Sequence, residues 1–434
     1  MRLFYAPAKR ETGIMWDTWL YWHQGTYYLY YLARSGDAWD NISLATSTDG
    51  VSWQELGPIL TKGPDVTWMG TGSTWKSPDL SRGAPYQLNF SEWKGPRQTI
   101  FFAESEDLIH WQRRDDCEFV QEEEGYEPQG RWDCIWTLPR PGGRLYGYWT
   151  ATPRFGTNSR FGMGQSSDGL HWEALPPPVV HGAGEGEVGA IEQIGDRYYM
   201  MFGCQGSMMT LVADQPEGPF HAAAKNRILL AGHTYFSRFF PSPQGLLVNH
   251  HSIARDHQVY LGLLKRMVPD AESTLHLGWW EGNEQLKRRP LPVELNAAAP
   301  QAPVRLLQPL DISAGLILEG RLTLPPHPFA PRRGLYIEFE AQRGLAILFD
   351  AQGRAECSLV GENGENAVVE TRIDREYSFP SPARWRLVVE SSLVEIYLED
   401  LLIECFSLPA PATGRFGLIE GCVPGCAEVL EVWQ

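Results

Sequence analysis

Three stretches decide the fold: STDGVSWQEL at 47–56, SEDLIHWQRR at 105–114 and SSDGLHWEAL at 166–175. Each has Ser-x-Asp, with a tryptophan four residues after the aspartate. The aspartates lie 58 residues (107 − 49) and 61 residues (168 − 107) apart. Repeats of this length, built from short alternating strands, are typical of β-propeller blades. We expect the Asp-Gly pairs to form the tight turn of a hairpin and the tryptophans to pack between neighbouring blades.

A strand rich in aromatic residues accompanies each repeat, and helical periodicity is nearly absent. Five such strands occur in the first two thirds of the chain, which predicts a five-bladed β-propeller over residues 1–295. They are GTYYLYYLA at 25–33, RQTIFFAES at 97–105, GRLYGYWTA at 143–151, DRYYMMFGC at 196–204 and GLLVNHHSI at 245–253.

The remainder of the chain changes character. Residues 296–312 are rich in alanine and proline and lack a strand period, so we expect a linker. Residues 313–434 contain short alternating segments such as GLYIEFEAQ at 334–342, separated by glycine and proline turns. This pattern predicts a β-sandwich and an all-β protein of two domains.

Composition excludes several function classes. The 434 residues carry a net charge of −16 and no run rich in lysine or arginine, which disfavours binding to nucleic acid and to anionic membranes. The N-terminus lacks the pattern of a signal peptide, and no stretch of 18 apolar residues occurs, so a cytoplasmic location is expected.

The seven cysteines are odd in number and scattered, which predicts buried thiols. The pair in GCVPGC at 421–426 has no partner pair and no histidine at zinc-finger spacing. We expect neither a metal nor a cofactor.

Four acidic residues occupy a recurring position, the first strand upstream of an aromatic strand: Asp17, Asp79, Asp133 and Glu187. A propeller gathers the first strands of its blades around a central channel, so these carboxylates should converge. Crowded carboxylates shift one another's pKa values, which can leave one as a proton donor and another ionised. Glycoside cleavage needs that division of roles.

Each assignment has an alternative. Asp17 and Asp133 could be structural, Asp79 could cap a turn, and Glu185 or Glu192 could take the place of Glu187. No lysine or arginine lies close to Glu187 in the sequence. We therefore expect it to be unpaired, since a cation would oppose the protonated form that a general acid needs.

The stretches around these acids resemble glycoside hydrolases of families 32 and 43, which are five-bladed propellers. MWDTWLYWHQGTYYLYYL at 15–32 looks like their nucleophile or base strand, and TGSTWKSPDL at 71–80 is similar to their second-blade motifs. The segments from Trp132 and from Glu187 resemble the third-blade and general-acid strands. RWRLVVESSLVEIYLEDLLIECFSL at 384–408 looks like a hairpin of the family 32 sandwich. Trp132-Asp133-Cys134 stands where family 32 has Arg-Asp-Pro.

The resemblance implies hydrolysis of a terminal furanosyl bond, β-fructofuranoside-like, in an oligosaccharide or other glycoside. In a retaining enzyme Asp17 is the nucleophile, Glu187 the acid and base, and Asp133 the transition-state stabiliser. In an inverting enzyme like the arabinofuranosidases and xylosidases of family 43, Asp17 is the base and Asp133 orients Glu187. The same sequence features also suit a noncatalytic sugar-binding propeller or a glycosyl-transfer enzyme.

Further candidates for substrate binding come from the same stretches and from AGHTYFSRFF at 231–240 and VNHHS at 248–252. Aromatic rings suit the C–H face of a sugar, although core packing is an equal alternative for each tryptophan. The candidates are Asp79, Trp16, Trp19, Trp75, Trp136, His233 and His250.

Overall fold

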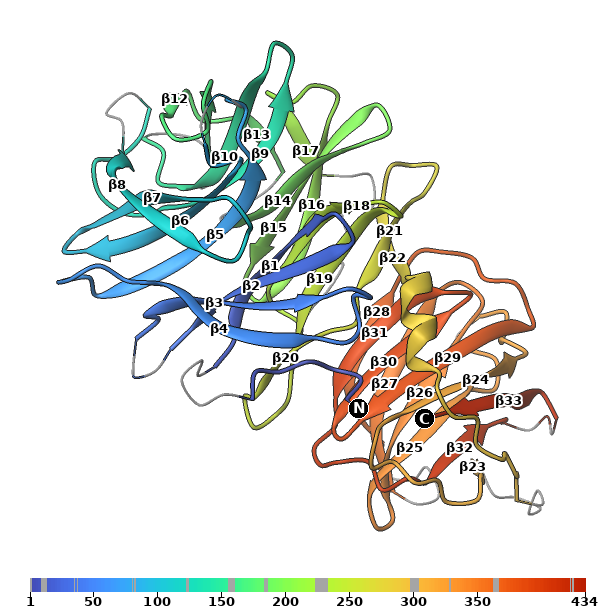
Figure 1. The fold of residues 1–434 in the computed structure, drawn as a ribbon. Helices are drawn as coiled ribbons and strands as arrows, with labels where there is room; N and C mark the ends of the chain where they lie inside the picture. The colour runs from blue at the N-terminus through green and yellow to red at the C-terminus, as the bar shows by residue number, and fades with distance from the viewer. Residues whose placement is uncertain are drawn as a thin grey trace. The chain divides into compact units, whose positions relative to one another are not determined.

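The computed structural model is built almost entirely of β-strands (Figure 1). A six-residue 3₁₀ helix, η2 (Glu281–Leu286), interrupts them, and no helix in the described part of the chain is long and apolar enough to cross a membrane. The described residues are 2–8, 14–34, 36, 38–79, 81, 83–121, 125–154, 161–182, 186–222, 233–296, 304–327, 329–361, 367–421, 423 and 425–434.

The chain divides into two compact units. One comprises Tyr5–His251 and Val259–Leu275, and the other comprises Met1–Phe4, Ser252–Gln258 and His276–Gln434. The domain limits expected from the sequence, 1–295 and 313–434, stay a prediction.

The first unit contains five antiparallel blades. Blade one is β1 (Trp16–His23), β2 (Thr26–Ala33), β3 (Asn41–Ser47) and β4 (Gln54–Thr61). Blade two is β5 (Trp68–Lys76), β6 (Tyr86–Lys94), β7 (Arg97–Ser105) and β8 (Trp111–Phe119). Blade three is β9 (Trp132–Arg140), β10 (Arg144–Ala151), β11 (Phe161–Ser166) and β12 (Glu173–Leu175).

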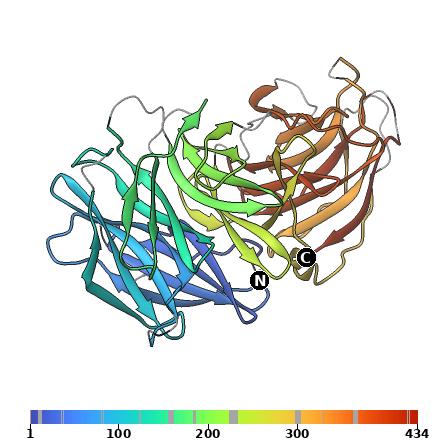
Figure 2. The same cartoon turned by 90° about the horizontal axis from the view of Figure 1, so that it is seen from above.

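Blade four is β14 (Glu187–Ile194), β15 (Arg197–Cys204), β16 (Ser207–Ala213) and β17 (Phe220–Ala222), with β13 (Val180–His181) added in parallel. Blade five is β18 (Ser237–Ser242), β19 (Gly245–Ile253) and β21 (Lys265–Pro269), and β20 (Val259–Leu261) also pairs with β19. Figure 2 shows the blades from above as separate twisted sheets, coloured from blue to yellow-green.

The innermost strands close into a ring. β1 contacts β5 and β18, β9 contacts β5 and β14, and β14 contacts β18. Residues at corresponding positions of these strands therefore face one channel although they are far apart in the sequence. The five-bladed propeller expected from the repeats is confirmed.

The repeated Ser-x-Asp stretches form one turn three times. In the first, Oγ of Ser47 accepts the backbone N–H of Gly50 at 2.8 Å, and Oδ1 of Asp49 accepts those of Val51 and Ser52 at 2.9 and 2.7 Å. Short polar side chains that cap nearby N–H groups favour such turns over helix or strand. Gly50 has φ 75°, a left-handed conformation that glycine adopts without strain.

The repeat tryptophans pack between blades, as predicted. Trp111 of blade two lies edge-on to Tyr30 of blade one, with ring centroids 6.0 Å apart. Trp172 of blade three meets Trp75 of blade two in the same geometry at 6.2 Å. Replacing the buried Trp172 by alanine would cost about 3–5 kcal/mol. The repeat therefore contributes to blade contacts as well as to turns.

The blade-two strands correct one detail of the sequence interpretation. RQTIFFAES is β7, the third strand of its blade, whereas the other four aromatic segments are second strands. The second strand is β6, YQLNFSEWK, whose aromatic residues are spread along the strand. The sequence interpretation placed Asp79 on the strand that precedes β7, taken as the second strand of the blade. The structure places Asp79 between β5 and β6, outside any strand.

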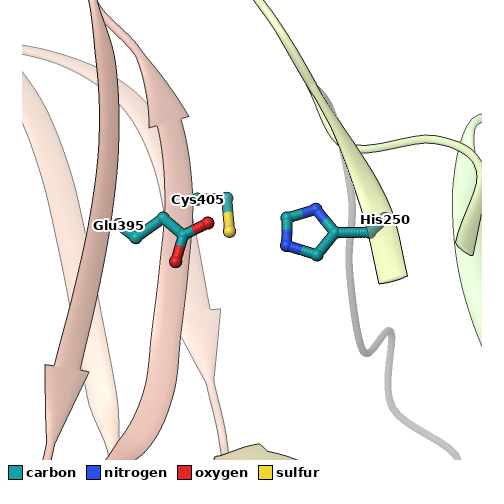
Figure 3. Close-up of side chains that lie close together, drawn as sticks. All are labelled: His250, Glu395 and Cys405. Carbon is teal, nitrogen blue, oxygen red and sulfur yellow. The ribbon is translucent and has the colours of Figure 1, made fainter. Parts of the chain in front are cut away.

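The second unit is a β-sandwich, drawn in yellow-orange to red in Figure 1. One sheet has the order β22 (Leu275–Trp279), β31 (Leu401–Ser407), β30 (Leu393–Leu398), β29 (Ala383–Glu390), β24 (Leu316–Leu322) and β33 (Ala427–Trp433). The other has the order β23 (Val304–Leu306), β32 (Phe416–Ile419), β25 (Arg333–Glu340), β26 (Arg343–Phe349), β27 (Arg354–Gly361) and β28 (Val368–Asp374). Strands β30 and β31 place Glu395 directly opposite Cys405, and both are drawn in Figure 3.

The stretch 296–312, predicted as a linker, contains β23, which pairs with β32. Its three residues are too few to show a strand period. The six described cysteines form no disulfide, and all are buried except Cys204, which is half-buried. Cys422 lies outside the described residues.

Candidate active site

A cavity of about 540 Å³ lies at the first residues of the innermost strands. Asp17, Asp133 and Glu187 all line it, together with Arg131 and Tyr235. The structure thus brings together the three carboxylates singled out in the sequence. The rest of the lining consists of Trp16, Leu32, Ala38, Trp39, Thr67, Trp68, Met69 and Gly70.

Each carboxylate lies beside a break in the strand register. β1 is irregular between Trp16 and Trp19, β9 opposite Tyr148–Thr150, and β14 between Val188 and Ala190. Bulges of this kind turn a side chain away from the regular alternation and are common next to active sites. Asp17 has φ 43°, a conformation that costs a non-glycine residue of order 1 kcal/mol.

Arg131 connects two of the carboxylates. Its Nη2 donates to Oδ2 of Asp133 at 2.9 Å, and its Nη1 donates to Oε1 of Glu187. Residues two apart in extended chain point to the same side, so Arg131 and Asp133 share a face. The expectation that Glu187 has no cationic partner is wrong. The partner, Arg131, lies two positions before Asp133 in the sequence and 56 positions before Glu187, so it was not considered as a partner of Glu187.

Asp133 is held firmly, with 5% of its surface exposed. Ser91 donates its hydroxyl to Oδ1 of Asp133 at 2.5 Å, and Gln98 in turn donates to Ser91 at 2.8 Å. A Cβ at Gly70 would lie 2.8 Å from the same carboxylate oxygen and 2.1 Å from the Ser91 hydroxyl, so a larger residue would displace this network. Such a network fixes the carboxylate in one orientation.

Asp17 lies close to a fully buried arginine. Arg238, on β18, donates to Sγ of Cys134 at 2.9 Å and to Oγ1 of Thr71 at 3.1 Å, and Thr71 donates to the backbone oxygen of Asp17. Burial raises the pKa of Asp17 to about 7. The charge of Arg238 opposes this rise, whereas the charges of Glu187 and Asp133 add to it.

Glu187 shows the opposite balance. Burial alone would raise its pKa, but the charge and hydrogen bond of Arg131 and a hydrogen bond from the Tyr235 hydroxyl at 2.8 Å outweigh burial, so the pKa lies below its ordinary value. The same carboxylate raises the pKa of Tyr235, after the larger effect of burial. With the cavity in this state, the proton resides more readily on Asp17 than on Glu187.

An aromatic wall completes the cavity. The rings of Trp16 and Trp39 are stacked with centroids 6.4 Å apart, and His251 packs on Trp16 at 4.7 Å. Trp68 lies at the first residue of β5 and stacks on Trp93 at 5.5 Å. Of these rings the sequence interpretation selected Trp16 alone. Trp39 lies outside any strand and the blade-two position was miscounted, so Trp39 and Trp68 were missed.

The other three selected tryptophans are buried core residues and do not line the cavity, which corrects their assignment. Each of their indole N–H groups finds an acceptor inside the protein. Trp19 donates to Thr74 at 3.0 Å, Trp75 to Gln87 at 2.8 Å and Trp136 to Glu192 at 3.4 Å.

The predicted histidines and Asp79 also lie away from the cavity lining. His250 is fully buried on β19 (Figure 3), where its Nε2 lies 2.6 Å from Nζ of Lys265. His233 is half-buried and does not line the cavity. Oδ1 of Asp79 accepts both the backbone N–H and the hydroxyl of Ser81, at 3.0 and 2.6 Å, so it caps a turn beyond β5. Glu185 lies outside the described residues.

No family model matches the sequence, and no curated protein sequence matches it. Solved structures do match the fold over nearly its whole length. Fructan 1-exohydrolase IIa from Cichorium intybus, in complex with 1-kestose, is 14% identical over 100% of this chain and 97% of its own, with a TM-score of 0.72. A β-fructofuranosidase of glycoside hydrolase family 32 from Bombyx mori, in complex with sucrose, is 12% identical over 97% and 91%, with a TM-score of 0.73.

A sucrose-6-phosphate hydrolase from Lactobacillus gasseri is 14% identical over 97% of this chain and 91% of its own, with a TM-score of 0.72. The chain has the fold of these enzymes. The all-β class and the propeller followed by a sandwich, expected from the repeats and the strand pattern, are confirmed. At 12–14% identity the likeness establishes the fold, and the activity has to be argued from the cavity.

Proposed function

We propose that the chain is a glycoside hydrolase that cleaves a terminal furanosyl bond, β-fructofuranoside-like, in the cavity of Asp17, Asp133 and Glu187. The observation that carries the proposal is the convergence of these three carboxylates, from three blades, on one cavity. Pairs of carboxylates that flank a bound sugar are the usual means of cleaving a glycosidic bond. The names of the matched structures, which include a fructan 1-exohydrolase and a sucrose-6-phosphate hydrolase, support the same substrate class.

In the proposed reaction, Asp17 attacks the anomeric carbon and Glu187 protonates the leaving oxygen, then activates water for the second step. Asp133, fixed by Ser91 and Arg131, binds sugar hydroxyls and strengthens these bonds in the transition state. The aromatic wall of the cavity suits the C–H face of a sugar ring.

The proton distribution has to change when the sugar binds. Asp17 must be ionised to attack and Glu187 must carry a proton to donate it, whereas the pKa shifts in the cavity favour the reverse. Positive charge that develops at the anomeric carbon lowers the pKa of the adjacent Asp17, because an opposite charge stabilises its ionised form. The charge of Glu187 contributes to the raised pKa of Asp17, so a proton on Glu187 would in turn favour ionisation of Asp17.

An inverting reaction uses the same residues with Asp17 as the base. The separation of the two carboxyl groups distinguishes the two outcomes, at about 5–5.5 Å for retention and about 6.5–9.5 Å for inversion. We favour retention, because the sandwich resembles that of family 32. Transfer to a sugar acceptor and noncatalytic binding are competing functions for the same cavity, and a cytoplasmic location stays a prediction from the sequence.

The test is a panel of sucrose, 1-kestose, inulin and aryl furanosides and pyranosides, incubated with the full chain and analysed for released sugar. NMR of the first product anomer on the best substrate decides between retention and inversion. Asp79→Asn is the matched control for the variants Asp17→Asn and Glu187→Gln, since Asp79 caps a turn outside the cavity. The activity of the Asp79→Asn variant should equal that of the wild type. Sugar binding without release of any product would show a binding protein and contradict the proposal.

A further inference from the structure

A second cavity, of about 280 Å³, lies within the sandwich unit. It is formed where β26 ends and β27 begins, beside the last residues of β28 and the segment after β24. These strands lie in the orange part of Figure 1. The cavity shares no residue with the carboxylate cavity of the propeller. Its size is near the lower end of the range for small-molecule sites, about 300 Å³, which suits a ligand of one sugar ring.

The charges in the cavity wall balance. Arg332 and Arg372 are both paired with Glu356, at 2.7 and 3.0 Å, and Arg354 is paired with Asp374 at 3.3 Å. Guanidinium groups that already hold carboxylates offer no excess charge to an anion. The wall therefore favours a neutral ligand with many hydrogen-bonding groups over a phosphate or a free carboxylate.

One carboxylate oxygen in this wall is buried without a hydrogen-bond donor. Asp350 is 3% exposed, and its Oδ1 accepts the backbone N–H groups of Gln352 and Arg354 at 2.8 and 3.2 Å. No described residue donates a hydrogen bond to its Oδ2, from which the nearest cation, Nη1 of Arg354, is 4.0 Å away. A buried acceptor without a donor is destabilising, so a ligand hydroxyl that donates to Oδ2 would be bound favourably.

An exposed aromatic ring lies next to a residue that lines the same cavity. Phe329 is 93% exposed, and its ring centroid lies 6.2 Å from that of His327, which lines the cavity together with Ala330. The exposed ring face of Phe329 is available to a ligand with an apolar face. A sugar ring offers C–H groups on its face and hydroxyls at its edge, which matches Phe329 and Asp350 together.

We propose that this cavity is a second sugar-binding site, which holds a monosaccharide or the terminal unit of an oligosaccharide. Oδ2 of Asp350 accepts a sugar hydroxyl, the paired arginines donate to others, and Phe329 packs against the ring. The site binds and does no chemistry. The proposal is independent of hydrolysis in the propeller, since a chain with no glycosidase activity would still bind sugar in the sandwich.

Hydrogen exchange of the full chain, measured by mass spectrometry with and without millimolar fructose, glucose, arabinose or 1-kestose, locates binding directly. We expect at least one sugar to protect amides at 348–356, whatever happens in propeller peptides. Asp350→Asn keeps an oxygen for the turn and removes the acceptor Oδ2. The sugar concentration that gives half-maximal protection should rise about tenfold in this variant. Phe329→Ala changes an exposed ring and should raise this concentration about threefold to tenfold without affecting the fold.

Two matched controls should leave the protection unchanged. Asp311→Asn alters an aspartate that also caps a turn of the sandwich, and Leu430→Ala removes an exposed side chain outside the cavity. The proposal is overturned if no sugar protects 348–356 in the wild type, if protection persists in both test variants, or if inorganic phosphate protects this segment and the sugars do not.

Discussion

Arg131 and Glu187 form an ion pair across two blades, with Nη1 of the arginine on Oε1 of the glutamate. The same guanidinium holds Asp133 at 2.9 Å, so one cation fixes the distance between the proposed acid and the proposed stabiliser. The ion pair also lowers the pKa of Glu187 below that of an isolated glutamate, so the ionised form is favoured. A general acid held in this way donates its proton only when the substrate shifts the balance of charge in the cavity.

Arg131→Met should raise the pKa of Glu187, because burial would then act without the opposing charge. The basic limb of the profile of kcat/KM against pH is expected to move to higher pH, since the acid stays protonated longer. The maximal kcat/KM should fall about tenfold to a hundredfold, the effect of losing hydrogen bonds to charged groups. Arg140→Met, at the last residue of β9 and outside the cavity lining, serves as the control. An unchanged basic limb would contradict the role of Arg131.

Tyr235→Phe removes one hydrogen-bond donor from Glu187 and leaves the ring in place. The pKa of Glu187 should rise in this variant too, though less than without Arg131, because a neutral donor stabilises the carboxylate less than a cation does. We expect a smaller shift of the same limb and a loss of kcat/KM of about tenfold. A shift larger than that of Arg131→Met would show that the charge is not the dominant effect.

Asp17→Asn should stabilise the fold at alkaline pH while it removes activity. The pKa of Asp17 is raised to about 7 in the folded chain, so its contribution to stability is fully present below the unfolded pKa near 4 and is lost as pH rises through 7. Asparagine does not ionise. The thermal midpoint of the variant should therefore exceed that of the wild type at pH 8, by about 2–4 °C for each kcal/mol, and approach it at pH 4. Equal midpoints at pH 8 would contradict the buried ionisation.

Glu192→Gln tests the same linkage at a residue outside the cavity lining. Burial raises the pKa of Glu192 to about 8, against the hydrogen bond from Trp136. The stability that this group contributes is lost as pH rises through 8, so the wild-type midpoint should fall more between pH 7 and pH 9 than that of the variant. Glutamine can still accept the Trp136 bond. Parallel curves for the two proteins would show that Glu192 remains exposed to solvent.

The propeller could be predicted from the sequence because each repeat reflects interactions between residues that are close together in the chain. Ser47 and Asp49 cap their own turn, and Trp111 and Trp172 of the second and third repeats each pack on the preceding blade. Both functions are visible within ten residues of sequence. The convergence of Asp17, Asp133 and Glu187, here called the triad, could be predicted from this architecture, because the inner strands close into a ring that brings the three residues to one cavity.

The partners of the triad were less accessible. The contact of Arg131 with Glu187 crosses blades and depends on bulges that change which way a side chain points. Trp19 and Trp136 are tryptophans on innermost strands, as Trp16 is, so nothing in the sequence separates them. In the structure Trp19 and Trp136 are buried, and Trp19 is separated from Trp16 by the bulge of β1. Asp79 was misplaced because β6 lacks the clustered aromatic residues of the other second strands.

The central claim, that Asp17 and Glu187 divide the chemistry of glycoside cleavage, is tested most directly by leaving-group dependence. kcat/KM is measured for the wild type, Asp17→Asn and Glu187→Gln on the best natural glycoside and on an aryl glycoside of the same sugar. We predict that Asp17→Asn loses about a thousandfold or more on both, and that Glu187→Gln loses as much on the natural substrate. On the aryl substrate, whose leaving group needs no proton, Glu187→Gln should retain most of the first step. Wild-type rates in either variant on the natural glycoside would contradict the account.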